Sequence, residues 1–552
     1  MIMAMTYLIV GVAAPAMAIA ILALKRSVEE TLAVGFFALS GVGILAALAT
    51  DGVYIDASYG LNDIYMFLDQ AARSADGLVP SVDYMSPIGP AYAAILAAAL
   101  EFGPPTVARL VTANLLVAVG AGALTLVFLV GRASLLTVAA SVLIVTATAL
   151  SLREITLPFA WSAASAITPY NRYGWALLLP IALFLTLPPL ARPSPVELLR
   201  AGLVGVVAAG LLLLKASYGA VAVALIVGCA VVRPRSLIVG AVALGSLGLS
   251  LVAVQVFVVP LGPHLADLMA IAEASTGPRR FLKVLRMAGE AGVYFALAAT
   301  FLVLLSTDRR PVAALLQRWR LMLLLAGLVV AGLLGLFQNH YSSEAVTYFI
   351  MLLLVVEWTR GAASVQRPVL VAVAALIAVR VAVVDVGAVA AQAVGTRLYP
   401  PVPLAGTPFA GLVVDPRAFP DRRLPPDLTR CKEGNCHQIA KIVEGRALLG
   451  DAVGPDDGVL ALTFSNPFAA EFGRPLRGAP IWFHEGRSFS RAAPPDPDVV
   501  FQDATFVILE KGEPSAIVLE EVYGPRLAER YAPVSEGRYW TLYRRLGPAP
   551  PG

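Results

Sequence analysis

An acidic loop between two apolar segments holds the residues best suited to chemistry. The stretch from Asp51 to Pro90 reads DGVYIDASYGLNDIYMFLDQAARSADGLVPSVDYMSPIGP, while the apolar runs on either side carry almost no charge. A carboxylate close to a bilayer is expensive to keep, so membrane proteins retain such groups mainly for function. We therefore expect the chemistry in this loop.

Asp63 is the carboxylate of this loop that is best placed to act as a base. The segment 62–74 is predicted to form a helix lying on the membrane surface, with Asn62 as its N-cap. Asp63 then lies in the first turn, where the helix dipole favours the ionised form that accepts a proton. The alternative, which spacing alone favours, is a first-turn charge with no catalytic role. The predicted apolar face consists of Ile64, Phe67, Leu68 and Ala71.

Asp83 is the second acid of interest, in the segment VDYMSPIGP. Two prolines and a glycine restrict the backbone just before the next apolar run. Such a rigid turn either holds the carboxylate toward a cavity or simply leads the chain tightly into the membrane.

Cations at the outward ends of the predicted helices suit a lipid phosphate. Arg172 lies between two tyrosines in TPYNRYGW, just before an apolar run, and Lys215 ends an apolar run in LLLLKASYG. Guanidinium and ammonium groups bind phosphate oxygens through charge-assisted hydrogen bonds. Ordinary contact with lipid headgroups is the alternative. Four further cations share one outward segment, against the usual inward bias of positive charge: Arg279, Arg280, Lys283 and Arg286.

Polar side chains near these charges are candidates for contacts with a sugar or acceptor. Tyr170 and Asn171 precede Arg172, and Tyr84 follows Asp83. No histidine pair has metal-ligand spacing and the acidic loop has no DxD pair, so no cofactor is required, although a divalent metal is compatible with the acids. The outward loop QNHYSSE, alternatively a solvated turn, adds Gln338, Asn339, His340 and Glu344.

The composition is that of a membrane protein. Of 552 residues, 58% are hydrophobic and 14% charged, and the mean hydropathy is +0.77. The net charge of +4 is small and gives no case for nucleic-acid binding, and the sequence has no P-loop, GxGxxG or HExxH motif. Apolar runs of this length are typical of transmembrane helices, and we expect about twelve spans. They lie near 5–24, 31–50, 106–130, 133–151, 173–190, 197–214, 217–232, 236–260, 290–307, 320–337, 345–358 and 367–390.

Positive charge fixes the expected orientation. Lysines and arginines fall in alternate loops, which are cytoplasmic if the short run 88–102 dips into the membrane without crossing. The N-terminus and the acidic loop 51–105 are then outside. The first run is interpreted as a retained helix, because no basic segment precedes it. The expected organisation is a bacterial inner-membrane domain (1–395), a Pro-rich linker (396–426) and a periplasmic α/β domain (427–552).

The C-terminal part is predicted to combine strands and helices. VLALTF (459–464), TFVILEK (505–511), AIVLEEV (516–522) and YWTLYRRL have the composition of strands, whereas CHQIAKIVEGRALL and GPRLAERY indicate helices. This pattern predicts a small α/β domain.

Cysteines and aromatic residues of this part leave alternatives open. Cys431 and Cys436 suit a small-loop disulfide outside the cytosol, since a metal site with the adjacent His437 lacks a second ligand pair. The aromatic side chains are either core residues or platforms that stack on sugar rings, and they are Trp482, Phe483 and Trp540.

The order of these parts resembles the GT-C superfamily of polytopic membrane glycosyltransferases. The loop NDIYMFLDQAARSADGLVPSVDYMSPIGP looks like the pattern of that family: an acid, an aromatic, a short helix, then Gly, Pro, Asp and a Pro-rich turn. A core of many spans and an outward C-terminal domain follow it. The resemblance implies a mainly α transmembrane bundle and a polyprenyl-phosphate-linked sugar as donor.

The resemblance also implies a mechanism and its residues. An acceptor hydroxyl of an envelope glycan or lipid attacks the anomeric carbon in one inverting displacement at the outer face. By matching position, Asp63 is the base and Asp83 the second acid. Two other classes fit the helices and cations: a transporter or flippase for a lipid-linked glycan, and a non-catalytic subunit of an envelope-assembly machine.

Overall fold

The computed structural model of the protein describes ten stretches of the chain. They are residues 28–50, 52–55, 61–151, 169–187, 192–232, 236–274, 385–398, 409–414, 434–486 and 488–547.

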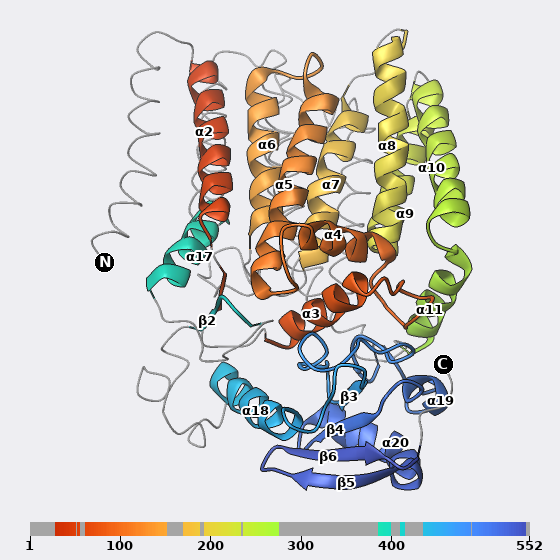
Figure 1. Cartoon of the computed structure of the whole chain (residues 1–552). Coiled ribbons are helices and arrows are strands. Elements are labelled where there is room, and N and C mark those ends of the chain that lie inside the picture. The colour runs from red at the N-terminus through yellow and green to blue at the C-terminus, as the bar shows by residue number, and fades with distance from the viewer. Residues whose placement is uncertain are drawn as a thin grey trace, which may run out of the picture.

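A bundle of roughly parallel helices forms one half of the molecule (Figure 1). Four described helices are long and apolar enough to cross a membrane, at Glu30–Leu48, Val107–Leu129, Pro195–Leu214 and Leu237–Phe257. The mainly helical architecture predicted from the apolar runs is therefore confirmed. The runs near 5–24, 290–307, 320–337 and 345–358 lie outside the described residues. The bundle helices are α2 (Val28–Leu48), α5 (Val107–Leu129), α6 (Leu135–Leu150), α7 (Pro169–Thr186), α8 (Pro195–Leu214), α9 (Ala216–Val232) and α10 (Leu237–Phe257).

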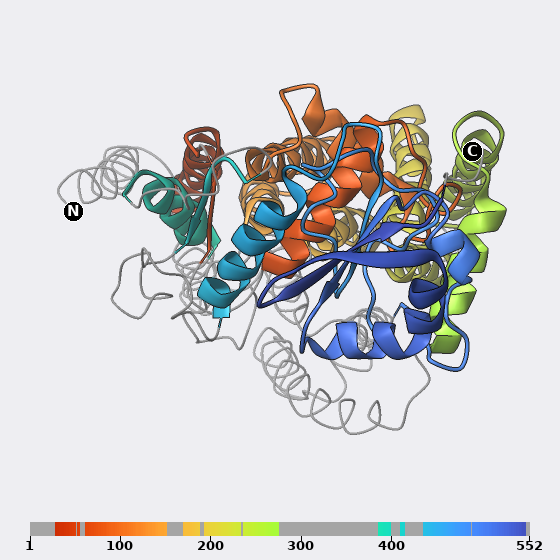
Figure 2. The ribbon, with the colours of Figure 1, turned by 60° about the horizontal axis from the view of Figure 1, so that its bottom comes forward.

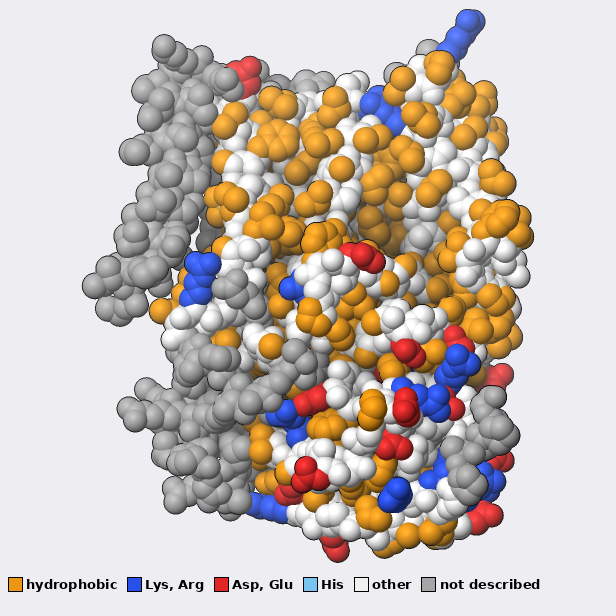
Figure 3. All heavy atoms as spheres, viewed as in Figure 1, with side chains coloured by type: hydrophobic (Ala, Val, Ile, Leu, Met, Phe, Trp, Pro, Cys, Tyr) orange, Lys and Arg blue, Asp and Glu red, His pale blue; other side chains and the backbone are white. Residues whose placement is uncertain are grey.

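Small residues let the bundle helices approach closely. A Cβ added at Gly205 of α8 would lie 2.1 Å from the carbonyl oxygen of Ala243 on α10. Close backbone approach through small residues is how helices associate in lipid, where hydrophobic burial gives little drive. In Figure 3 hydrophobic side chains cover the bundle, while most charged side chains gather at the opposite half.

Three shorter helices lie across the end of the bundle that faces the C-terminal domain (Figure 1). They are α3 (Leu61–Ala75), α4 (Pro90–Leu100) and α11 (Leu261–Ala274). At 1.5 Å per residue α4 is about 17 Å long, too short to cross a hydrocarbon core of about 30 Å. The run 88–102 thus forms a helix that does not span, as predicted.

The C-terminal domain is a four-stranded sheet with helices. The strand order is β3-β4-β6-β5, in which β3 and β4 are parallel and the other pairs antiparallel. Figure 2 shows α18 and the sheet lying over the end of the bundle that carries α3. The elements are α18 (Gly434–Leu449), β3 (Val459–Leu462), α19 (Pro497–Val500), β4 (Phe506–Glu510), α20 (Pro514–Arg530), β5 (Tyr531–Glu536) and β6 (Trp540–Arg545).

The strand predicted at 516–522 is wrong, because this segment is part of helix α20. Glu513 caps the helix, its carboxylate accepting from the Ala516 amide at 2.8 Å, and Pro514 occupies the first turn. The run of β-branched residues resembles a strand, but its buried positions recur at helical spacing: Ala516, Leu519, Tyr523 and Leu527.

Two of the three candidate sugar-stacking aromatics belong to the core of this domain. Phe483 and Trp540 are buried, and the Trp540 indole N–H donates to the Lys441 carbonyl at 2.7 Å. Trp482 is only partly buried. A satisfied indole in a packed core is not available to a glycan, so only Trp482 remains a candidate.

A short pair of parallel strands joins a late segment of the chain to the acidic loop. Strand β1 (Val53–Ile55) pairs with β2 (Leu412–Val414). Helix α17 (Gly387–Leu398) contacts both α2 and β1, and its Gln392 side chain accepts from the Tyr54 amide at 2.6 Å. The end of the last apolar run therefore lies beside the loop that carries Asp63.

Candidate functional site

Helices from three parts of the chain converge where the bundle meets α3. Asp63 lies in the first turn of α3 and is partly buried. Arg172 lies in the first turn of α7, and Lys215 is the C-cap residue of α8. The predicted base and two of the predicted phosphate-binding cations thus occupy the same end of the bundle.

Lys215 is held at the end of α8 by polar and aromatic neighbours. Its backbone is extended there, so the side chain leaves the helix axis. The ammonium group donates to Asn171 Oδ1 at 2.9 Å and lies 5.3 Å from the ring centre of Tyr170 and 5.9 Å from that of Tyr218. The Lys215 ammonium group is thus fixed at this end of the bundle by a hydrogen bond and by two tyrosine rings.

Arg172 is the buried charge of the site. It is only 4% exposed, and Asp63 and Asp385 both lie within electrostatic range of its guanidinium. A desolvated guanidinium is costly unless carboxylates or other acceptors surround it. Asp385, itself 2% exposed, is a residue that the sequence prediction missed. A lone carboxylate near the end of an apolar run was the available signal.

Tyrosines form the wall between α3, α4 and α7. The ring centre of Tyr92 lies 5.6 Å from that of Phe67, 5.9 Å from that of Tyr170 and 6.1 Å from that of Tyr173. The Tyr173 hydroxyl donates to Asn114 Oδ1 at 2.5 Å. Tyr92 and Asn114 were not predicted as site residues, because a single polar group inside an apolar run is indistinguishable from packing.

Helix α3 is buried on both faces, so the predicted surface helix does not expose its second face to solvent. The predicted apolar face is buried, but so are Tyr65, Met66, Asp69 and Gln70 on other sides. The ring centre of Tyr65 lies 5.9 Å from that of Phe409, and Ser465 of the C-terminal domain donates to the Asn62 carbonyl at 2.9 Å. Asn62 lies inside the first turn of the helix instead of capping it.

The Asp83 side chain stabilises the turn in which it lies. Its carboxylate accepts from the Val79 amide at 2.7 Å, and its carbonyl accepts from the Gly478 amide at 2.6 Å. Tyr84 beside it is 2% exposed, and its burial raises the pKa of the phenol. These contacts tie the turn to the C-terminal domain, and a role for Asp83 as second acid stays a prediction.

The loop 79–89 also contacts α11. His264 Nδ1 lies 3.2 Å from Ser81 Oγ, and Asp267 accepts from the Ser86 amide at 3.1 Å. Burial lowers the pKa of His264 and raises the pKa of Asp267, the latter opposed by hydrogen bonds from Ser86 and Ser81. The loop is thus held by α11 on one side and by the C-terminal domain on the other.

Gly89→Ala is expected to displace the loop from the end of α8 and to lower Tm. The Gly89 amide donates to the Leu214 carbonyl at 3.2 Å, and an added Cβ would lie 1.9 Å from the Leu213 carbonyl oxygen. Overpacking of this kind destabilises by about 1–3 kcal/mol. Thermal unfolding of the detergent-solubilised protein measures it. Gly120→Ala, where nothing lies within 4 Å, is the control and should not lower Tm; an unchanged Tm in Gly89→Ala contradicts this packing.

The remaining predicted site residues cannot be placed. The disulfide partner Cys431 lies outside the described residues, and the side chain of Cys436 is likewise not described. Also outside the described residues are Arg279, Arg280, Lys283, Arg286, Gln338, Asn339, His340 and Glu344.

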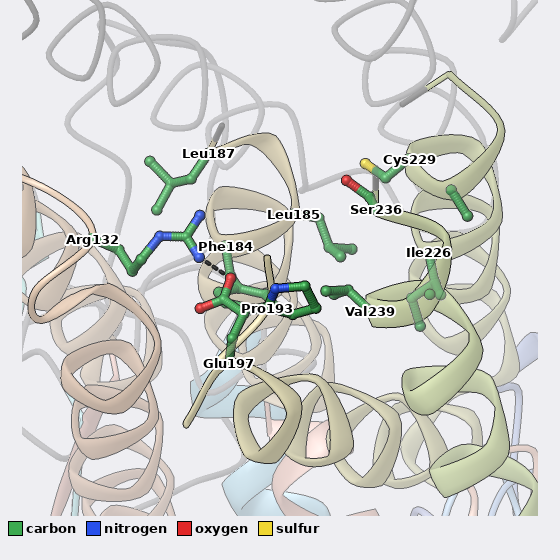
Figure 4. A pocket seen from close by; sticks show the side chains of 12 residues that line it. Arg132, Phe184, Leu185, Leu187, Pro193, Glu197, Ile226, Cys229, Ser236 and Val239 are labelled. Atoms are coloured by element: carbon green, nitrogen blue, oxygen red, sulfur yellow. Dashed lines mark ion pairs between the residues drawn. The ribbon is translucent and has the colours of Figure 1, made fainter. Parts of the chain in front are cut away.

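A second polar cluster lies at the opposite end of the bundle, beside a small pocket (Figure 4). Arg132 and Glu197 form a buried ion pair there, and the Arg132 guanidinium lies 5.7 Å from the ring centre of Phe184. Under the predicted orientation this end faces the cytoplasm. This arginine–carboxylate pair therefore lies far from α3 and from the candidate site.

No protein-family model and no curated protein matches the chain. The chain is similar to the crystal structure of ArnT from Cupriavidus metallidurans bound to undecaprenyl phosphate, at 14% identity and a TM-score of 0.38, covering 94% of this chain and 98% of that one.

Proposed function

We propose that this membrane protein is an inverting glycosyltransferase of the GT-C type that takes its sugar from a polyprenyl-phosphate carrier at the outer face of the membrane. The observation that supports this most is the meeting of Asp63, Arg172 and Lys215 at one end of the bundle. A base and two cations at one end of a membrane-spanning bundle suit a reaction between a hydroxyl group and a lipid-linked phosphate ester.

Asp63 acts as the general base in this proposal. The acceptor oxygen forms a bond to the anomeric carbon while the bond from that carbon to the phosphate oxygen breaks. The bonding electron pair leaves with the phosphate, and the hydroxyl proton passes to the Asp63 carboxylate. The first-turn position of Asp63 favours its ionised, proton-accepting form.

Lys215 and Arg172 stabilise the departing polyprenyl phosphate. A phosphate leaving group is already ionised at neutral pH and gains charge as the bond breaks, so cations serve it and a general acid is not needed. The Lys215 side chain is partly exposed and that of Arg172 is buried. Asn171 and Tyr170, which precede Arg172 in α7, contact the Lys215 ammonium group and so link the two cations. This role is assigned to Lys215 and Arg172. We propose that a further cluster of cations adds to it: Arg279, Arg280, Lys283 and Arg286.

The acceptor approaches the end of the bundle at which α3 and the C-terminal domain meet. Ser465 already contacts the backbone of Asn62 there. Asn62, Tyr84, Tyr170, Asn171, Gln338, Asn339, His340 and Glu344 are proposed to contact sugar or acceptor hydroxyls. The acceptor is an envelope glycan or glycolipid, and the C-terminal domain with its proposed Cys431–Cys436 disulfide lies in the periplasm. No metal is assigned a step.

Release of polyprenyl phosphate from a defined donor tests the proposal. We expect purified protein in lipid nanodiscs to consume one of a panel of undecaprenyl-phosphate sugars when a detergent extract of its own envelope supplies the acceptor. Chromatography of the lipid products, with radiolabelled sugar followed into the acceptor, measures both halves of the reaction. Movement of intact donor across a vesicle membrane without transfer of the label would instead show a flippase.

A further inference from the structure

A buried ion pair on α3 joins the helix that carries Asp63 to the C-terminal domain. Arg73 donates to Asp69 through Nε at 2.7 Å and through Nη2 at 3.0 Å, a two-bond contact at i and i+4. Pairs with this spacing normally lie in water and contribute little. Here Asp69 is fully buried and Arg73 is 1% exposed.

The remaining nitrogen of the Arg73 guanidinium, Nη1, contacts the C-terminal domain. Arg73 Nη1 donates to the Ala479 carbonyl at 2.7 Å, and the guanidinium carbon lies 4.5 Å from the ring centre of Tyr84. Residue 479 follows Gly478, whose amide donates to the Asp83 carbonyl. The planar fork of arginine is therefore fixed by α3, by the turn 79–84 and by the C-terminal domain together.

Helix α3 is thus attached to the C-terminal domain near both of its ends. Ser465 holds the Asn62 carbonyl in the first turn, next to Asp63. Arg73 holds the last turn, eleven residues after Asn62, which is about 17 Å along a helix. Two attachments at that separation fix the direction of the helix as well as its position.

We propose that Asp69 and Arg73 are positioning residues through which the C-terminal domain holds Asp63 in register with Arg172 and Lys215, so that this domain is part of the catalytic unit. This inference rests on the proposed function of Asp63. Burying an ion pair costs desolvation free energy. The pair also fixes the geometry of the groups that it joins. Misplacement of a catalytic group by about 1 Å is sufficient to slow a reaction by about 100-fold.

Two variants separate positioning from simple stability. Arg73→Met leaves the Asp69 carboxylate buried without its partner, so we expect both Tm and kcat to fall. Asp69→Asn/Arg73→Met removes both charges, so Tm is expected to recover most of this loss. The bond to Ala479 remains absent in the double variant, and its kcat is therefore expected to stay about 100-fold low while the KM for the donor changes little.

Hydrogen exchange gives a readout that does not depend on activity. Amides of the peptide 61–75 are expected to exchange faster in both variants than in the wild-type protein, measured well below the Tm of each. A double variant whose kcat and α3 exchange both return to wild-type values with Tm would overturn the proposal, since the pair would then be only structural.

Arg132→Met is the matched control at the opposite end of the bundle. It also breaks a buried arginine–carboxylate pair, that with Glu197, and should lower Tm. Its kcat and its exchange in 61–75 are expected to match wild type at a temperature where it is folded. An equal loss of kcat in this control would attribute the effect to general destabilisation and contradict the proposal. Absence of sugar transfer by wild type would remove the proposed function, whereas faster exchange in 61–75 would still establish the attachment itself.

Discussion

Asp63→Asn is expected to abolish sugar transfer while leaving the protein folded and able to hold its donor. Asparagine has nearly the same shape as aspartate but cannot take a proton from the acceptor hydroxyl. Loss of a positioned general base slows such reactions by about 10²–10⁴-fold. The variant should stay folded, because a first-turn carboxylate gains only about 0.3–1 kcal/mol from the helix dipole and Asp385 still faces the Arg172 guanidinium. Initial rates and Tm of the purified variant measure the two effects.

Asp76→Asn is the matched control for this substitution. Asp76 follows the last turn of the same helix, is exposed, and lies in the same acidic loop. We expect wild-type rates from it, because its side chain is exposed and is not among the charges that act on Arg172. Turnover that survives in Asp63→Asn would remove Asp63 as the base, whereas equal losses in both variants would indicate a general effect of loop charge.

Lys215→Met is expected to lower kcat/KM for the donor by about 10²–10³-fold, the scale seen when one preorganised donor to a developing negative charge is removed. Methionine keeps the length and apolar stem of lysine but gives the phosphate no proton and no charge. The Asn171 side chain also loses its 2.9 Å partner. Rates at several donor concentrations separate weaker donor binding from slower chemistry.

The control for Lys215→Met is Lys511→Met in the C-terminal domain. The Lys511 ammonium pairs with Glu536 at 2.6 Å on the sheet and takes no part in the proposed site. Its rates should equal those of wild type. An unchanged kcat/KM in Lys215→Met would show that the lysine only anchors the end of α8 to Asn171.

Apolar patterning was sufficient to predict the described transmembrane helices and the non-spanning α4. Continuous runs of apolar residues have one stable solution in lipid, a helix, so their length alone identifies them. The C-terminal segment 516–522 is different, because valine and isoleucine fit either a strand or a packed helix. The Glu513 cap and the spacing of Leu519, Tyr523 and Leu527 decided the outcome.

The site was predictable where a charge stood against an apolar background. Asp63, Arg172 and Lys215 are unusual in their surroundings, and the structure brings them to the same end of the bundle. Asp69 and Arg73 were not predicted, because their i, i+4 spacing is that of an ordinary solvated pair. Only the tertiary structure, in which the C-terminal domain contacts α3, makes them buried.

Native mass spectrometry of Asp63→Asn tests directly whether Asp63 is a base that acts on a bound lipid-linked sugar. The variant and the wild-type protein are purified gently from their own membrane and compared side by side. We predict that Asp63→Asn carries an intact polyprenyl-phosphate sugar, whose mass identifies the class of sugar, and that wild type carries less of it because it turns the donor over. Detection of only bulk phospholipids on both proteins, together with no activity on added lipid-linked sugars, would contradict the proposed glycosyltransferase function.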